Sequence, residues 1–210
     1  MNQVDEPRWP EESDALGPPA AAGDWRDTLR AATDLALLGV LTTLAALPLV
    51  TAGAAVATAS AALHQWTRRG HWPAAGDLLR TFARALLPGA AATLVAAAVA
   101  ALLTVNALAL AAGTVPGGTA LVVVTALLGA LACGLAGAIV VQIGRQHARG
   151  WRSAARVATR TALDRPAMVL AITGTLTFAA ALGTLVLPII TPILAGYVLF
   201  ALHAITRRLG

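Results

Sequence analysis

The stretch "LPLVTAGAAVATASAALHQWTRRG", residues 47–70, has a counterpart at the other end of the chain, "LPIITPILAGYVLFALHAITRRLG", residues 187–210. Each begins with Leu-Pro, places a Thr three residues after the Pro, and ends with Leu-His followed by Thr-Arg-Arg. A fainter repeat, in which Gln, Arg, Trp, Arg and Pro recur in this order, links residues 65–88 with residues 142–166. An apolar run between a proline hinge and arginines is typical of a membrane-crossing helix. The repeats therefore indicate a helical hairpin used three times.

Composition favours a membrane protein. Of the 210 residues, 58% are hydrophobic and 12% are charged, which is about half the charge of a typical soluble domain. Three blocks, residues 35–63, 85–144 and 166–202, contain no Asp, Glu, Lys or Arg. Because about 20 apolar residues cross a bilayer as a helix, the sequence predicts an all-α, polytopic helical membrane protein.

The three blocks are long enough to hold more than three helices. The turn "GTVPGGT" at residues 113–119 divides the second block, and a hinge at Pro188 and Thr191 divides the third. By the repeat, a matching hinge at Pro48 and Thr51 divides the first. Six spans are therefore predicted as three hairpins, at about residues 31–48, 51–66, 85–112, 120–144, 166–187 and 191–206. The alternative is five spans, with the first block as one long tilted helix.

The arginines predict the orientation in the membrane. Six spans place all arginine-rich connecting segments on one side, and the positive-inside rule makes that side cytoplasmic. Both termini are then cytoplasmic, and all 15 basic residues are Arg, which suggests a bacterial plasma membrane. Residues 1–23 are acidic and rich in Pro, so they are expected to be a disordered tail before one transmembrane domain at residues 24–210. Five spans would place the tail outside.

Two basic segments between spans are predicted to form amphipathic helices on the cytoplasmic side. In residues 76–87, Phe82 and the leucines share one face, whereas Arg80 and Arg84 lie on the other. In the second segment the arginines recur at helical spacing and form one stripe if the segment is a single helix: Arg145, Arg149, Arg152, Arg156 and Arg160. The arginines of both segments are candidates for contact with anionic lipid headgroups or with a protein partner.

The sequence predicts no catalytic, cofactor or metal site, and we expect no nucleic-acid partner. Beyond Asp34 the only acidic residues are Asp77 and Asp164, and no two histidines have the spacing or carboxylate neighbours of a metal site. Asn106 is a candidate intramembrane polar site, either for a substrate or for a hydrogen bond between helices. A coupled transporter usually keeps an ionisable residue within a span. A non-enzymatic membrane protein is therefore the leading hypothesis.

Residues 46–90 combine three features that carry a family resemblance. These are the hinge "LPLVTAGAA" with Pro48, Thr51 and Gly53, the helix ending "AALHQWTRR", and an amphipathic segment with Phe82 before the next span. In these features the chain resembles the YesL family of small bacterial membrane proteins. Such proteins are often encoded beside carbohydrate uptake systems, so the resemblance implies an accessory role with subunits of an ABC-type importer. The alternative function is a stand-alone transporter or channel for a small solute.

Overall fold

The computed structural model describes residues 25–112, 118–148, 150–185 and 191–209, and every regular element within these ranges is a helix. The elements in chain order are α1 (Trp25–Ala46), the 3-10 helix η2 (Leu49–Thr51), α2 (Ala52–Arg69), α3 (Ala75–Ala111), α4 (Gly118–Arg145), α5 (Trp151–Asp164), α6 (Pro166–Leu185) and α7 (Thr191–Arg208). The prediction of an all-α chain is confirmed for the described residues.

The chain divides into two units, residues 1–34 and residues 35–210. The described part of the first unit is the start of α1, where Asp27 and Arg30 form an ion pair of 3.7 Å across one helical turn. The predicted tail at residues 1–23 lies outside the described residues. All packing reported below belongs to the second unit.

Four helices in the described chain are long and apolar enough to cross a membrane, namely α1, α3, α4 and α6. They make the chain a multi-pass helical membrane protein by the length and composition of its helices. The helices α2 and α7 are not among the four. Each has only 18 residues, and its last turn contains two arginines, Arg68 with Arg69 in α2 and Arg207 with Arg208 in α7. Six spans remain a prediction.

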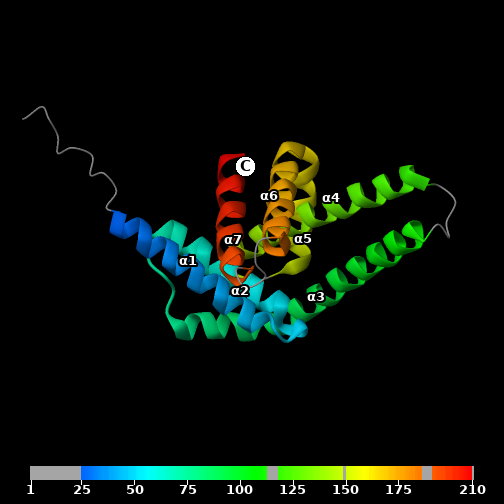
Figure 1. Cartoon of the computed structure of the whole chain (residues 1–210). Coiled ribbons are helices and arrows are strands. Elements are labelled where there is room, and N and C mark those ends of the chain that lie inside the picture. The colour runs from blue at the N-terminus through cyan, green and yellow to red at the C-terminus, as the bar shows by residue number, and fades with distance from the viewer. Residues whose placement is uncertain (1–24, 113–117, 149, 186–190, 210) are drawn as a thin grey trace, which may run out of the picture. The chain divides into compact units, whose positions relative to one another are not determined.

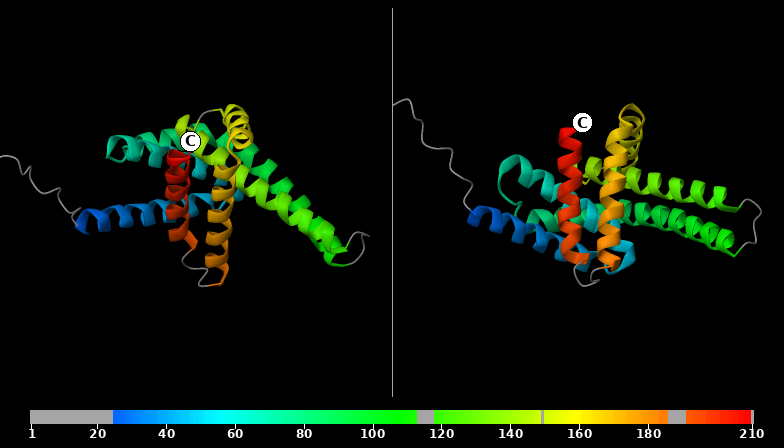
Figure 2. Two further views of the ribbon diagram at one scale, coloured as in Figure 1. Left: turned by 90° about the horizontal axis from the view of Figure 1, so that it is seen from above. Right: turned by 45° about the horizontal axis from the view of Figure 1, so that its top comes forward.

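The helices α3 and α4 lie side by side and run in opposite directions (Figures 1 and 2). Along this pair, large apolar side chains are exposed on both helices: Leu94, Val95, Val99, Leu102, Val105 and Leu108 on α3, and Val122, Val123, Val124, Leu127, Leu128 and Leu131 on α4. A water-soluble protein rarely exposes so continuous an apolar surface. Lipid hydrocarbon suits such a surface, because apolar side chains need no hydrogen bonds and the backbone groups in the interior of a helix bond to one another.

Small residues let the helices cross at close range. Gly53 of α2 faces Gly89 of α3, where an added Cβ would lie 2.5 Å from the backbone nitrogen of Ala54. Gly39 of α1 faces Gly196 of α7 in the same manner, backbone against backbone. The helix α4 meets α2 and α6 through further glycines: Gly134, Gly137 and Gly144. Such contacts are the usual basis of helix association in membranes, where burial of apolar surface gives little driving force.

The last pair of helices has a different direction from the α3–α4 pair. The helices α6 and α7 lie side by side and run across α4 (Figure 2). Their contact with α4 buries Met168 and Ile172 of α6 together with Leu202 of α7. The buried residues of the second unit form three clusters, and α4 contributes to two of them through Ala138, Val141 and Ile143.

Residues 76–87 do not form the separate surface helix that the sequence predicts. They are the first turns of α3, which continues through Pro88 to Ala111 as one helix of 37 residues. Pro88 removes one backbone donor, yet a break there would leave further backbone groups unpaired beside apolar surface. At 1.5 Å per residue α3 is roughly 55 Å long, well beyond the ~30 Å hydrocarbon core. One end of α3 therefore extends out of the hydrocarbon, and the arginine-bearing start is the polar end.

Candidate functional site

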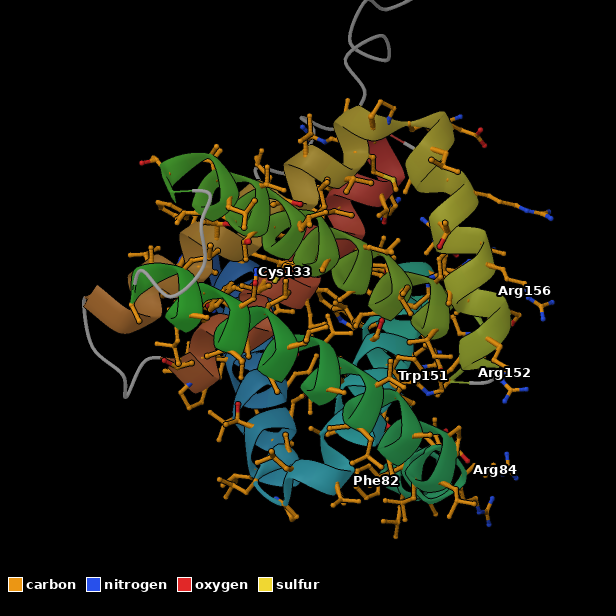
Figure 3. The ribbon with its side chains drawn as sticks, turned by 90° about the vertical axis from the view of Figure 1, so that its right-hand side faces the viewer. Phe82, Arg84, Cys133, Trp151, Arg152 and Arg156 are labelled. Atoms are coloured by element: carbon orange, nitrogen blue, oxygen red, sulfur yellow. The ribbon has the colours of Figure 1, made fainter. Side chains whose placement is uncertain are left out.

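The predicted arginines of α3 and α5 come together on one side of the second unit. Figure 3 shows Arg84, Arg152 and Arg156 extending outward from the same side, although Arg84 and Arg152 are 68 positions apart in the chain. We call these three residues the basic face. All three are exposed, as are Arg80 and Arg160 on the same helices. Arg80 also forms an ion pair with Asp77, at 3.8 Å between Nη1 and Oδ1.

The apolar sides of α3 and α5 hold the basic face in place. Phe82 of α3 and Trp151 of α5 both pack against one buried cluster that includes Ala57 of α2 and Ile143 of α4 (Figure 3). Ala154, one turn after Trp151, is fully buried in the same cluster. In both helices the apolar residues lie on one face and the arginines on the opposite face. Burial of the apolar face therefore leaves the arginines exposed.

The single stripe of five arginines does not form, because the second basic segment is not one helix. The helix α4 ends at Arg145, and α5 begins at Trp151. Between them His147, Ala148 and Gly150 have φ of 52°, 60° and 73°. Glycine adopts this left-handed conformation without steric cost, so Gly150 is a natural helix boundary. Arg145 is thereby separated from the arginines of α5, and Arg149 lies outside the described residues.

The long repeat has a structural counterpart at the ends of α2 and α7. Its shared pattern Leu-His-x-x-Thr-Arg-Arg closes both helices, and the rings of His64 and His203 lie 6.3 Å apart between centroids. In each copy the Thr hydroxyl donates to the carbonyl of the His, at 3.0 Å for Thr67 and for Thr206. His203 is 3% exposed, and its Nδ1 lies 2.9 Å from the carbonyl oxygen of Leu199. The repeated ends of two distant helices thus meet each other.

Two further basic contacts tie α4 and α5 to the end of α7. Arg145 Nη2 donates to the carbonyl of Thr206 at 3.3 Å. Arg165 Nη1 donates to the carbonyl of Leu209 at 2.6 Å. The periodicity of the sequence does not single out Arg165. The signal that could have found it is its place directly before Pro166, where a helix boundary is expected.

The predicted hinges differ in how much of them the structure describes. Pro48 precedes η2, and the Thr51 hydroxyl donates to the carbonyl of Ala45 at 2.6 Å, so it joins the end of α1 to the start of α2. The backbone N–H of Gly53 donates to Thr93 Oγ1 at 2.8 Å. Thr191 is the first residue of α7. Pro188 lies outside the described residues.

Asn106 forms the hydrogen bond between helices that was one of its two predicted roles. Its Nδ2 donates to Thr125 Oγ1 of α4 at 2.8 Å, and the Thr125 hydroxyl donates to the carbonyl of Leu121 at 2.9 Å. The bond joins α3 and α4 within their apolar stretch. This pairing satisfies two polar groups that lipid would leave without partners.

Within the part of the chain that the structure describes, no group of three or more His, Cys, Asp or Glu side chains could hold a metal ion. Cys133, one of three small residues spaced by four on α4, is exposed rather than packed against another helix.

Compared with family models, with curated proteins and with solved structures, the chain matches none.

Proposed function

We propose that this chain is a non-enzymatic integral membrane protein that uses the basic face on α3 and α5 to dock an acidic cytoplasmic partner. One observation carries the proposal: Arg84, Arg152 and Arg156 extend from one side while Phe82 and Trp151 fix both helices to a shared core (Figure 3). An orientation signal needs only positive charge on the correct side. A docking surface also needs its charged helices at defined positions, and the packing of α3 and α5 on one core supports that requirement.

The topology belongs to the same proposal. Six spans, formed by α1 to α4 with α6 and α7, return the chain to its starting side and leave the basic face and both termini in the cytoplasm of a bacterial cell. The short α2 and α7 would then cross a bilayer that thins locally around them. Reporter fusions at Asp14 and Gly210 test this topology. Both should report the cytoplasm, and an external Asp14 would favour five spans.

The partner is proposed from the family resemblance. It is a subunit of an ABC-type carbohydrate importer, so that the chain serves as an accessory component of carbohydrate uptake. The alternative, a stand-alone transporter or channel with a path near Asn106, is less favoured because Asn106 is already bonded to Thr125. A substrate would have to compete with that hydrogen bond.

The docking experiment compares two pairs of arginines that carry equal charge. Replacing Arg152 and Arg156 by Glu should abolish co-purification of the partner, because the fixed positive charges would become repulsive. Arg68 and Arg69 are exposed at the end of α2. Replacing both by Glu changes the net charge by the same amount and should leave co-purification nearly intact. Equal losses in both variants would mean that total charge matters and that the face is not a docking surface.

A further inference from the structure

A polar cavity of about 460 Å³ lies where α4, α5 and α7 end, apart from the basic face. Three arginines line it: Arg145 from α4, Arg165 after α5, and Arg207 from α7. Gln142 and Asp164 are also part of its wall. Only Asp164 carries negative charge among these lining residues. The cavity therefore gathers cations from three segments that are far apart in the sequence.

Two of the three guanidinium groups are held in position by the last turn of α7 and the residue after it. Arg145 donates to the carbonyl of Thr206 at 3.3 Å, and Arg165 donates to the carbonyl of Leu209 at 2.6 Å. A guanidinium has five N–H donors in a rigid plane, so Arg145 keeps donors for a ligand after this one bond. Side chains fixed in this way lose little conformational freedom when they bind.

Helix ends near the cavity change its charge but do not cancel it. The C-termini of α4, α5 and α7 each contribute roughly half a negative charge, and the start of α6 beside Arg165 contributes roughly half a positive charge. Together with Asp164 these groups offset only part of the three arginine charges. Capping of helix ends therefore does not account for all three arginines.

We propose that this cavity binds one phosphate group. Arginine matches phosphate oxygens with paired N–H donors, and the amide of Gln142 can supply another donor. A phosphodiester carries one negative charge, and a lining of three arginines and one aspartate favours an anion. The cavity also lies at the end of α4, one of the helices long enough to cross a membrane. The headgroup of an anionic phospholipid and free inorganic phosphate share this chemistry.

The test uses the purified full-length chain in a neutral detergent with three variants. In the first arm, native mass spectrometry measures the retention of added phosphatidylglycerol, with diacylglycerol as the lipid that lacks phosphate. In the second arm, inorganic phosphate is added and the thermal unfolding temperature is recorded. The cavity variants are Arg207→Gln and the pair Arg145→Gln with Arg207→Gln. The matched control is the pair Arg68→Gln with Arg69→Gln, which removes equal charge from residues that do not line the cavity.

We expect one phosphatidylglycerol to be retained per chain, and about tenfold weaker retention in Arg207→Gln, the typical effect of losing one charge-assisted hydrogen bond. The double cavity variant should lose more, and the control should stay close to wild type. Stabilisation by inorganic phosphate without lipid retention would identify free phosphate as the occupant. Arg145 also contacts α7, so the double variant is the one at risk of not folding. In that case the result for Arg207→Gln alone decides whether the cavity binds phosphate. Equal losses in cavity and control variants, or no response to either ligand, would overturn the proposal.

Discussion

The start of α3 and the helix α5 are two basic segments with similar sequence patterns but different boundaries. Each packs apolar residues on a shared core, presents arginines outward and is followed by a proline, Pro88 or Pro166. Yet α3 continues through Pro88 to Ala111, whereas α5 ends at Asp164 and α6 begins at Pro166. The proline after the first basic segment, Pro88, thus lies inside a helix, whereas the proline after the second, Pro166, begins a new one.

The difference follows from the groups that surround each proline. Arg165 leaves the helical conformation, with φ −138° and ψ 72°, as expected because the α region is disfavoured for a residue before proline. Its backbone N–H still reaches the carbonyl of Thr161 at 2.9 Å, and its guanidinium reaches Leu209. Before Pro88 stands Leu87, an exposed apolar residue without a side-chain donor or acceptor, and Gly89 is pressed against Gly53. In this chain the helix ends before the proline that follows a polar, hydrogen-bonded residue, Arg165, and continues through the proline that follows an apolar one, Leu87.

The largest effect is expected from breaking the contact that holds α3 beside its proline. Replacing Gly89 by Val places side-chain atoms against the backbone of Gly53 and Ala54, which cannot move away without separating α2 from α3. We expect a loss of about 3 kcal/mol in the free energy of unfolding, at the upper end of overpacking effects. Titration of the purified protein from mixed micelles into denaturing detergent measures it.

The matched control for Gly89 is Gly174 in α6. A Cβ added there meets nothing within 4 Å, so Gly174→Val should change the free energy of unfolding by less than about 1 kcal/mol. If both variants lost equal stability, intrinsic helix propensity would account for the effect. The close α2–α3 crossing would then not be what keeps α3 continuous.

A smaller and more local effect is expected when the anchor of α5 is removed. Trp151 is partly buried against the core, so Trp151→Ala should cost about 2 kcal/mol, less than a fully buried Trp. Hydrogen exchange should speed up in residues 151–164 but not in residues 75–87, because the latter are continuous with the rest of α3. The control is Val157→Ala, since Val157 is 42% exposed. Equal acceleration in both segments would show that the two depend on one anchor.

Much of the fold could be predicted from the sequence, because apolar blocks, glycines and prolines act locally. Residues 120–144 were predicted for the helix that spans Gly118–Arg145, and residues 51–66 for the helix that spans Ala52–Arg69. The continuity of α3 was not predicted, because the change from a basic to an uncharged segment near residue 85 suggested two separate helices. The contact of Gly89 with Gly53 lies across 36 positions of sequence and has no local signal.

The candidate site was predicted less completely, for the same reason. Helical spacing identifies Arg84, Arg152 and Arg156 individually, but only packing on the core brings α3 and α5 to one side (Figure 3). The long repeat contained the shared Leu-His-x-x-Thr-Arg-Arg ending, and the meeting of its two histidine rings requires the positions of α2 and α7. Composition and periodicity describe single helices. Contacts between distant helices decide which side chains form a site.

The smallest effect, and the most direct test of the comparison, comes from replacing each proline by Ala. In α3 the change restores a backbone N–H that can bond to the carbonyl of Arg84, so Pro88→Ala should stabilise the protein. We expect about 1 kcal/mol, less than the ~3 kcal/mol cost of Pro in an unadapted helix, since α3 already accommodates the ring. In α6 the proline occupies the first helical position, where its fixed φ is favourable, so Pro166→Ala should destabilise by about 0.5 kcal/mol. The same micelle titration measures both, and the two changes should differ in sign. If both replacements changed the free energy of unfolding in the same direction, the two prolines would have equivalent backbone surroundings. The different boundaries of α3 and α5 would then have another cause.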